Sequence, residues 1–272
     1  MWLAVDAAGP GVRAWPVGPD GAAGAPVAAD RLELLGASAG RLVVDGAPDA
    51  PVLACPIAID DLAAATVTGR GLLPRIRHEK DESAVARLVG ALELTRWRDA
   101  PGRGRLVGSC GADGTLAWIF ARDGRIERLI ATATGATLAD LLHRTKAASA
   151  GDEDDDVAFE RGLSIAEDAR DLSSDLDRVM GEAAGGRIRG GAIGATFAGV
   201  LIGHDAARSL KLGRLGAPAA LVGAGLLADR YAIALGRFGV AVRRIDPVRA
   251  LVAGCHALGG PSDSDCEGNP AH

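Results

Sequence analysis

The sequence predicts an α/β fold that is built from two related units. Each unit opens with two short apolar stretches separated by a turn, at residues 2–5 and 12–17 in the first unit and at residues 105–110 and 116–121 in the second. Apolar runs bounded by turn residues are typical of β-hairpins. Helical patterns close each unit, the clearest at residues 81–96. A hairpin followed by helices, occurring twice, indicates a duplicated, two-lobed architecture.

The first unit covers residues 1–100 and ends at a loop with proline and glycine, residues 98–104. Its best-defined element is the helix over residues 81–96, where apolar side chains recur every three or four positions. The other elements expected in this unit are strands at residues 25–28, 42–44, 51–54 and 72–76 and a helix at residues 59–66.

The second unit covers residues 101–258, and residues 259–272 are expected to form a disordered tail. A strand at residues 125–132 is expected to extend the sheet of the second hairpin. The remaining elements are helices at residues 138–147, 157–170, 174–180, 193–210 and 247–257 and strands at residues 219–222 and 239–245. Helices that alternate with short buried strands are typical of α/β domains.

A glycine-rich corner lies between the strand at residues 219–222 and a helix at residues 226–236. It reads Gly223-Ala224-Gly225. Glycine lets the backbone come close to a ligand, and the N–H groups at a helix start bind anions. The corner therefore indicates a nucleotide site. The alternative interpretation is a helix that starts close to its strand for packing reasons.

The composition argues against several classes of function. The chain of 272 residues has a net charge of −5 with both signs spread along it, so no nucleic-acid partner is expected. Its four cysteines form no CxxC pair, which argues against a zinc site. No apolar run is long enough to span a membrane, and the amino terminus lacks the pattern of a signal peptide. We therefore expect a cytoplasmic protein without a membrane partner.

Two turns carry candidate ligands for phosphate and metal. Asp6 ends the first strand, where a carboxylate can hold a hydrated magnesium ion; an ordinary aspartate at a strand end is the alternative. At the tip of the second hairpin, Asp113-Gly114-Thr115 can offer N–H and hydroxyl groups to a phosphate. The alternative there is a plain hairpin turn, for which Asp-Gly is a common signal.

Five stretches of the chain match the amino-acid pattern of one protein family. They are Asp6 with Arg13-Ala14-Trp15, Leu88-Val89-Gly90-Ala91, Ala158-Phe159-Glu160-Arg161-Gly162-Leu163, FAGVLIGHD at residues 197–205 and LVGAGLLADRYAIAL at residues 221–235. In these stretches the chain resembles the 2-dehydro-3-deoxygalactonokinase family. That family is a branch of sugar-acid kinases within the actin-like, hexokinase-like ATPase superfamily.

The resemblance implies a two-lobed actin-like ATPase fold, which is a duplicated ribonuclease H-like α/β architecture. It also implies ATP- and Mg²⁺-dependent phosphorylation of 2-dehydro-3-deoxy-D-galactonate to its 6-phosphate. The partner would then be a small-molecule sugar acid, and a homodimer is one assembly that we consider.

The resemblance further implies roles for individual residues. Asp6 would hold Mg²⁺ and take part in catalysis, together with Asp81 and Glu82 as candidates for the base that deprotonates the sugar hydroxyl. The alternative for Asp81 and Glu82 is a pair of acids that the dipole of a helix start favours. Glu160 and Arg161 would contact the sugar acid; the alternative is that they cap a helix. The residues implied for nucleotide binding are Gly9, Gly11, Arg13, Asp113, Gly114, Thr115, Gly223, Ala224, Gly225 and Arg230.

The sequence departs from the family pattern at positions that handle phosphate. The first hairpin turn contains Pro10, which has no N–H to donate, and the family's lysine beside Gly114-Thr115 is absent. In an ungapped alignment the family's paired glutamates fall on Ala84 and Val85. Two alternative functions follow. One is a catalytically weakened relative that binds nucleotide or sugar acid as a sensor or regulatory protein, and the other is a scaffold that kept only the fold.

Overall fold

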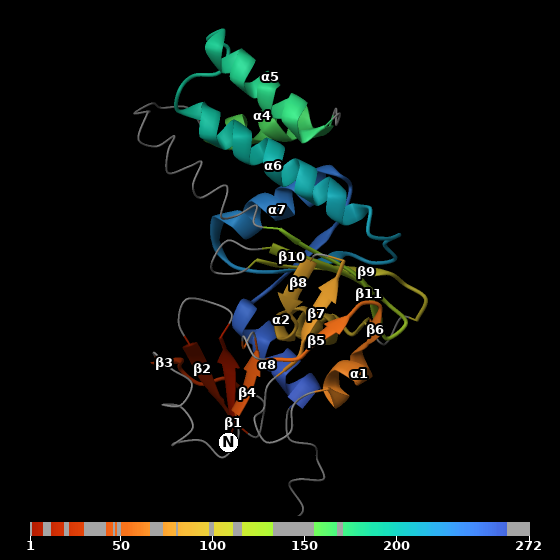
Figure 1. The fold of residues 1–272 in the computed structure, drawn as a ribbon. Coiled ribbons are helices and arrows are strands. Elements are labelled where there is room, and N and C mark those ends of the chain that lie inside the picture. The colour runs from red at the N-terminus through yellow and green to blue at the C-terminus, as the bar shows by residue number, and fades with distance from the viewer. Residues whose placement is uncertain are drawn as a thin grey trace, which may run out of the picture.

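The computed structural model arranges the chain as three sheets with helices between and outside them (Figure 1). It describes residues 2–7, 12–18, 22–29, 42–45, 47, 50–65, 73–79, 81–97, 101–110, 116–132, 155–167 and 171–259. Within these residues no helix is both long enough and apolar enough to cross a membrane.

The first sheet has the strand order β3-β2-β1-β4. Its strands are β1 (Trp2–Asp6), β2 (Val12–Val17), β3 (Val27–Ala29) and β4 (Leu42–Asp45). β1 runs antiparallel to β2 and parallel to β4, so that Asp6 pairs with Arg13 on one side and with Asp45 on the other. The parallel pairing places the carboxyl ends of β1 and β4, which are both aspartates, side by side.

The second sheet repeats this order and extends it. Its strands are β6 (Ile57–Ala58), β9 (Arg105–Cys110), β10 (Leu116–Arg122), β11 (Arg125–Thr132), β12 (Ala219–Val222) and β13 (Val242–Ile245). They follow the order β13-β12-β9-β10-β11-β6, with β9 antiparallel to β10 and parallel to β12. Strands β9 to β12 therefore take the places that β1 to β4 take in the first sheet. The two sheets are topological copies of each other.

A small third sheet contains residues that were predicted to be helical. Its strands are β5 (Val52–Ala54), β7 (Arg75–His78) and β8 (Asp81–Ala84), in the order β5-β7-β8. The helix predicted over residues 81–96 begins only with α2 (Ala86–Leu94), because the residues before it pair antiparallel with β7. The apolar periodicity belongs to α2 alone. Asp81 and Glu82 are consequently strand residues, and the dipole of a helix start does not explain them.

Helices α2 and α8 (Pro247–Gly259) lie between the first and second sheets (Figure 1). α2 contacts β9 and β12, while α8 contacts β1 and β4. Two glycines let these helices touch through their backbones. A Cβ on Gly90 would lie 1.8 Å from the carbonyl oxygen of Ala250, and one on Gly254 would lie 1.8 Å from that of Ala86. The last helix of the chain is therefore packed into the middle of the fold.

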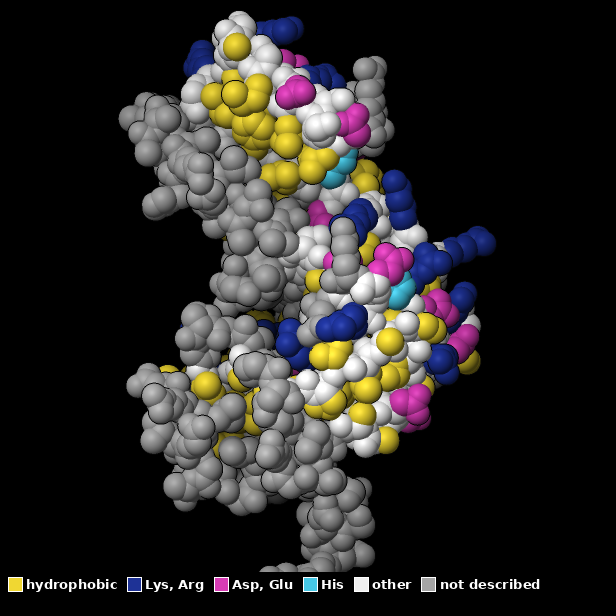
Figure 2. Space-filling model, in the orientation of Figure 1, with side chains coloured by type: hydrophobic (Ala, Val, Ile, Leu, Met, Phe, Trp, Pro, Cys, Tyr) yellow, Lys and Arg dark blue, Asp and Glu magenta, His cyan; other side chains and the backbone are white. Residues whose placement is uncertain are grey.

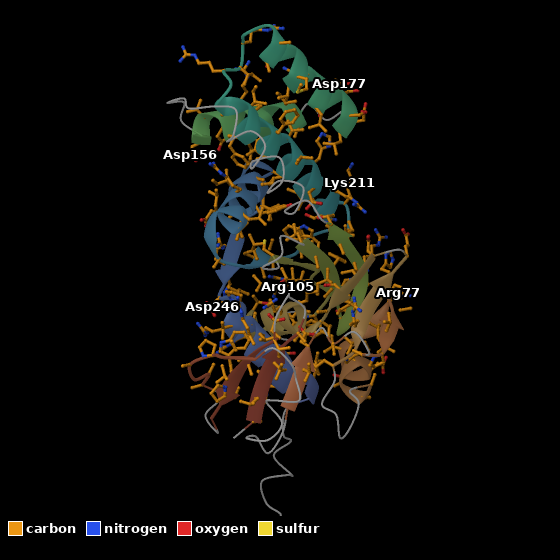
Figure 3. All side chains as sticks on the ribbon, turned by 60° about the vertical axis from the view of Figure 1, so that its left-hand side comes forward. Arg77, Arg105, Asp156, Asp177, Lys211 and Asp246 are labelled. Carbon is orange, nitrogen blue, oxygen red and sulfur yellow. The ribbon has the colours of Figure 1, made fainter. Side chains whose placement is uncertain are left out.

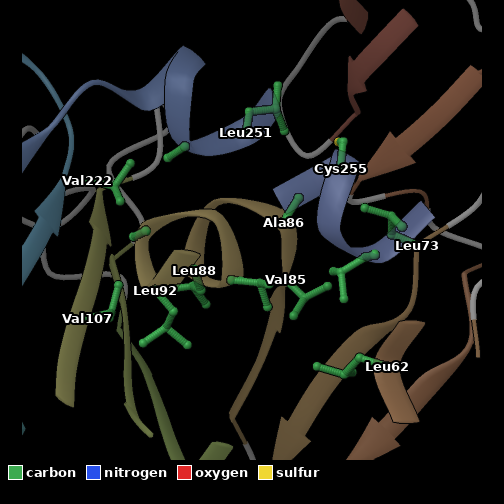
Figure 4. Packing of buried hydrophobic residues seen from close by; sticks show 14 of the residues in the cluster. Leu62, Leu73, Val85, Ala86, Leu88, Leu92, Val107, Val222, Leu251 and Cys255 are labelled. Atoms are coloured by element: carbon green, nitrogen blue, oxygen red, sulfur yellow. The ribbon is translucent and has the colours of Figure 1, made fainter. Parts of the chain in front are cut away.

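The hydrophobic core around α2 and α8 joins both sheets. Val43 of the first sheet and Val107 and Val222 of the second belong to one buried cluster with Leu88 and Leu251 (Figure 4). Fully burying an aliphatic side chain of this size stabilises a fold by roughly 1.5–3 kcal/mol. Because the cluster is shared, the structure joins the two sheets through a continuous apolar layer. The division of the chain at residue 100 stays a prediction.

A second group of helices covers the outer face of the second sheet (Figure 1). They are α4 (Asp155–Glu167), α5 (Leu172–Ala184), α6 (Ala192–Leu210) and α7 (Gly225–Arg237), and α1 (Ile59–Ala64) packs separately on α8. α6 and α7 share a hydrophobic cluster with β9, β10 and β12. α4 crosses α6 closely, since a Cβ on Gly199 would lie 2.2 Å from the carbonyl oxygen of Phe159.

The surface of this helical group is partly apolar. Figure 2 shows hydrophobic side chains gathered over it, whereas basic and acidic side chains are interspersed over the rest of the visible face. Val157 of α4 and Met180 of α5 are 67% and 55% exposed. Exposed apolar patches often mark contacts with other proteins. The homodimer considered from the sequence stays a prediction.

The remaining expectations concern the last strand, one helix and the tail. The strand expected at residues 239–245 starts only at Val242, because Gly239 has a φ of 77° and belongs to the turn after α7. Gly259 is the last residue of α8 and not the first of a tail. The helix expected at residues 138–147 and the tail residues 260–272 lie outside the described residues.

Candidate active site

Two aspartates and one arginine form a charged cluster at the carboxyl ends of β1 and β4. The side chain of Asp6 is 14% exposed and its Oδ2 accepts a hydrogen bond from Nη2 of Arg87, whose side chain is 19% exposed. Asp45, which lies beside Asp6 in the sheet, is only 2% exposed. We call Asp6, Asp45 and Arg87 the charged cluster.

Asp45 connects this cluster to the start of α2. Its Oδ1 accepts hydrogen bonds from the backbone N–H groups of Val85 at 3.1 Å and of Ala86 at 3.2 Å. The first N–H groups of a helix have no partner within the helix, and a carboxylate that accepts from them acts as a cap. Asp45 lies 40 residues before Val85 in the chain. The cap therefore depends on the tertiary structure.

Burial sets the electrostatics of the charged cluster. It raises the pKa of Asp45 from 3.8 to about 6, against the N–H group of Ala86 and the charge of Arg87, which act to lower it. The neighbouring charge of Asp6 also raises this pKa. The charged cluster thus combines a mostly buried carboxylate, a fully buried carboxyl group with a pKa of about 6, and a guanidinium whose charge acts on both.

The glycine corner at the end of β12 presents backbone groups in place of charged side chains. Gly223 has a φ of 153° and Gly225 a φ of 76°, a region that residues with a side chain rarely adopt. Ala224 and Gly225 are exposed at the start of α7, and Ala224, the N-cap residue, makes no side-chain capping bond. Its first N–H groups are therefore available to an anionic ligand.

The interior side of the corner is tightly packed. A Cβ on Gly223 would lie 3.0 Å from the Cβ of Cys110, the last residue of β9, and 3.1 Å from that of Ala228. Nη2 of Arg244 donates a hydrogen bond to the carbonyl oxygen of Gly223 at 3.0 Å. Burial raises the pKa of the Cys110 thiol to about 12, which keeps it protonated at neutral pH. Cys110 is thus a packing residue beneath the corner and not a nucleophile.

Helix α8 connects the glycine corner with the charged cluster. The N–H of Gly223 donates to the carbonyl oxygen of Ile245, two residues before α8 begins. Further along α8, Gly254 packs on the carbonyl group of Ala86, and the N–H of Ala86 donates to Asp45. Figure 4 shows Val222, Ala86 and Leu251 of α8 among the residues of one buried layer. The glycine corner and the charged cluster are therefore both held by this buried layer.

The structure places the other residues predicted near phosphate or the reacting hydroxyl as follows. Arg13 lies opposite Asp6 on β2 and is exposed. Asp81 lies on β8, and its Oδ2 is 3.7 Å from Nη2 of Arg208 on α6. This ion pair does not involve the charged cluster. Glu82 pairs with Arg77 through the backbone, and its side chain lies outside the description. The predicted residues Gly9, Gly11, Asp113, Gly114 and Thr115 lie outside the described residues.

Three further residues that were predicted to bind substrate or nucleotide form ion pairs between helices. Oε2 of Glu160 lies 2.6 Å from Nη1 of Arg237 on α7, and Nη2 of Arg161 lies 2.8 Å from Oε2 of Glu182 on α5. The third, Arg230, is 9% exposed; it pairs with Asp156 at 2.7 Å and stacks 4.3 Å from the centre of the Phe159 ring. Arg230 points from α7 toward α4. These contacts join α4 to α5 and α7, and the ligand roles of these residues stay predictions.

Sequence reasoning missed Asp45 and Arg87. A signal for Asp45 was present, because an aspartate follows the apolar run at residues 42–44 just as Asp6 follows the run at residues 2–5. Arg87 carried no signal of its own, since a basic residue on an amphipathic helix is usually solvated. Its role depends on the position of α2 beside β1 and β4.

The donor set of the charged cluster fits Mg²⁺ only in part. The described residues contain no group of three or more His, Cys, Asp or Glu side chains that could hold a metal ion. Mg²⁺ in kinases is commonly held by one or two carboxylates, with water and the phosphates of the substrate as the other ligands. Asp6, which ends its strand with a side chain that is 14% exposed, fits one such ligand position.

Comparison with solved structures shows the fold. A crystal structure from Sinorhizobium meliloti, of a protein provisionally assigned as a 2-dehydro-3-deoxygalactonokinase, matches with a TM-score of 0.74 and 21% identity over 95% of this chain and 98% of that one. The activator of 2-hydroxyisocaproyl-CoA dehydratase from Clostridium difficile, solved with bound ADPNP, matches with a TM-score of 0.51 and 12% identity over 99% and 98% of the two chains. The predicted actin-like ATPase fold is thereby confirmed.

Comparison at the level of sequence shows the family. No curated protein matches the chain. The model of one family, described as 2-keto-3-deoxy-galactonokinase, matches residues 43–258, which is most of the 272 residues. Because this match covers most of the chain, and the fold agrees with it, the chain belongs to the 2-keto-3-deoxy-galactonokinase family.

Proposed function

We propose that the protein is an ATP-dependent kinase that phosphorylates 2-dehydro-3-deoxy-D-galactonate at its 6-hydroxyl group. Membership of a sugar-acid kinase family with an ATPase fold supports the use of ATP and of a sugar-acid substrate. The observation that carries the proposal is the charged cluster, in which Asp6 ends β1 beside a guanidinium and a second carboxyl group. A cytoplasmic location remains part of the proposal.

The residues of the site divide the work of phosphoryl transfer. The N–H groups at the start of α7 bind the nucleotide, because Gly223 and Gly225 leave the corner open to it. Asp6 would hold Mg²⁺, which would supply positive charge to the phosphates. Arg87 adds a fixed positive charge beside Asp6. Stabilising charge that develops in the transition state is the main task of such a site.

The proposed reaction also needs a base that takes the proton of the sugar hydroxyl. Asp81 and Glu82 remain the candidates, and Asp81 is the one whose side chain is described, 15% exposed beside Arg208. A general base must come within hydrogen-bond reach of the hydroxyl in the substrate complex. Glu160 and Arg161 remain the candidates for binding the sugar acid.

The proposal is tested by ADP release from purified protein supplied with ATP, Mg²⁺ and the keto-deoxy sugar acid. We expect substrate-dependent release of ADP, and Asp6→Asn should lower its rate by about 10²-fold or more, as loss of one charge stabiliser does elsewhere. Asp177→Asn is the matched control, because Asp177 lies on exposed α5 at the helical end of the molecule (Figure 3). Equal rates for Asp6→Asn and wild type would remove Asp6 from the mechanism.

One observation favours a second candidate, a weakened family member that binds nucleotide as a sensor. The carboxylate of Asp6 is already paired with Arg87, which reduces the negative charge that it offers to a metal ion. A protein of this kind releases no ADP above background but melts at a higher temperature with ATP and Mg²⁺, because a ligand that binds only the folded state stabilises it. A melting temperature that does not respond to nucleotide would leave only the scaffold.

A further inference from the structure

Arg87 is held in place more firmly than an arginine on a helix surface usually is. It is the second residue of α2, and its Nη2 donates to Asp6 while the side chain is only 19% exposed. Its Nε is buried and finds no acceptor among the described residues. A guanidinium has five N–H donors, so the pair with Asp6 leaves donors of Arg87 for a further acceptor.

The backbone that carries Arg87 is fixed from two sides. Asp45 accepts hydrogen bonds from Val85 and Ala86, the two residues immediately before Arg87, and both of these residues are fully buried. From the other side, Gly254 of α8 packs against the carbonyl group of Ala86. The position of the guanidinium is therefore set before any ligand arrives, and a preorganised donor loses less entropy on binding.

A phosphate group bound near Asp6 would need a cation, and the two hairpin turns do not provide one. Neither hairpin turn, residues 7–11 or residues 111–115, contains a lysine or an arginine. Arg13 lies opposite Asp6 but is exposed, and exposed charges are screened by water and salt. Among the described residues, Arg87 pairs with Asp6 and its charge also acts on Asp45. Arginine matches phosphate geometry with two parallel N–H groups, which lysine does not.

We propose that Arg87 binds a phosphate group of the nucleotide, with Asp6 as its carboxylate anchor and Asp45 as the residue that positions it through the start of α2. This inference rests on the proposed binding of ATP. It extends the proposal by assigning the phosphate-binding cation to a helix of the first unit, outside both hairpin turns.

The test compares the binding of ATP with that of adenosine, which lacks phosphate, by calorimetry and by thermal shift. Arg87→Met should weaken ATP binding by about tenfold to a hundredfold, as loss of a charged hydrogen bond does, and leave adenosine binding unchanged. Arg122→Met is the matched control, since the exposed side chain of Arg122 pairs with Glu127 on the β10–β11 hairpin. Arg87→Lys keeps the charge beside Asp6 and should weaken ATP binding by a smaller factor; it serves as the test if Arg87→Met does not fold.

The possible outcomes separate this inference from the proposed function. If the wild type binds ATP and both Arg87→Met and Arg87→Lys bind it equally well, the proposed role of Arg87 is overturned. The proposed kinase function is not affected by that result. A wild type that binds neither ATP nor adenosine would overturn both. An equal loss of ATP and adenosine binding in Arg87→Met would also overturn the inference, because it would show a general distortion of the site.

The positioning role of Asp45 is tested by the same two ligands. Asp45→Ala removes the cap of α2 and should weaken ATP binding more than adenosine binding. Asp45→Asn keeps an oxygen that can accept from Val85 and Ala86, so it should restore most of the ATP affinity. A residue that served stability alone would change both ligands equally, and that result would overturn the positioning role.

Discussion

The two sheets have the same strand order but differ in what their strands carry at the carboxyl ends. In the first sheet β1 and β4 end in Asp6 and Asp45, next to the guanidinium of Arg87. In the second sheet the corresponding strands β9 and β12 end in Cys110 and Val222, and a glycine corner follows. The first sheet therefore offers charged side chains at these strand ends, and the second sheet offers backbone groups.

This difference shows how a duplicated fold acquires a site that is not symmetric. Charged groups at the ends of β1 and β4 must be partly desolvated, and the raised pKa of Asp45 shows that this costs free energy. The glycine corner avoids that cost, but it depends on two residues without side chains. The helices α2 and α8 hold the two sheets against each other. Substitutions between these helices, in the charged cluster and in the glycine corner therefore measure what each part contributes to the free energy of unfolding.

The largest effect is expected where the two sheets are joined. In Gly254→Ala the new Cβ would lie 1.8 Å from the carbonyl oxygen of Ala86, so α8 and α2 must move apart. Overpacking of this kind costs about 3 kcal/mol of unfolding free energy, and more where backbone has to shift. The measurement is urea unfolding of the two proteins. Gly236→Ala in α7, where a Cβ meets nothing within 4 Å, is the control and should stabilise by about 0.5–1 kcal/mol. Similar losses for both variants would contradict close packing of α2 on α8.

The second prediction concerns the charged cluster. Because the pKa of Asp45 is about 6 in the folded protein and near 3.8 when it is unfolded, the folded state holds the proton more tightly between these values. Asp45 therefore costs no stability below pH 3.8, and its contribution becomes unfavourable by about 3 kcal/mol as the pH rises through 6. Asp45→Asn does not titrate, so the difference in unfolding free energy between it and the wild type should move in favour of Asp45→Asn by about 2 kcal/mol between pH 4 and pH 7.

Unfolding in urea at pH 4, 5, 6 and 7 checks the second prediction, because other carboxyl groups titrate alike in both proteins and cancel in the difference. Asp177→Asn on exposed α5 serves as the control for a substitution without burial. Curves for wild type and Asp45→Asn that run parallel over this range would show that Asp45 is not buried against the start of α2.

The smallest effect is expected in the glycine corner. Gly223→Ala places a Cβ 3.0 Å from Cys110 at a φ of 153°, which should cost about 2 kcal/mol of unfolding free energy. Gly225→Ala meets no atom within 4 Å and is strained only by its φ of 76°, so it should cost less. Chemical unfolding and adenosine binding measure both effects. If Gly225→Ala were the more destabilising of the two, packing against Cys110 would not be what constrains the corner.

The parts of the site that could be predicted are those written in a short stretch of sequence. An apolar run followed by Asp6, and another followed by Gly223-Ala224-Gly225, are local patterns, and each was found at its strand end. The helix over residues 81–96 was predicted too long, because local periodicity does not reveal that Asp81 to Ala84 pair with β7. Glu160, Arg161 and Arg230 matched a family pattern, but the contacts that they make in the structure join helices.

The sequence by itself determined the duplicated α/β fold, the family, Asp6 and the glycine corner, because alternation, turns and motif wording are properties of neighbouring residues. Only the tertiary structure decided that β4 lies beside β1, that Asp45 caps a helix 40 residues away and that Arg87 meets Asp6. The physical reason is that buried charges need partners, and here the partners come from segments that only the packing of α2 and α8 brings together.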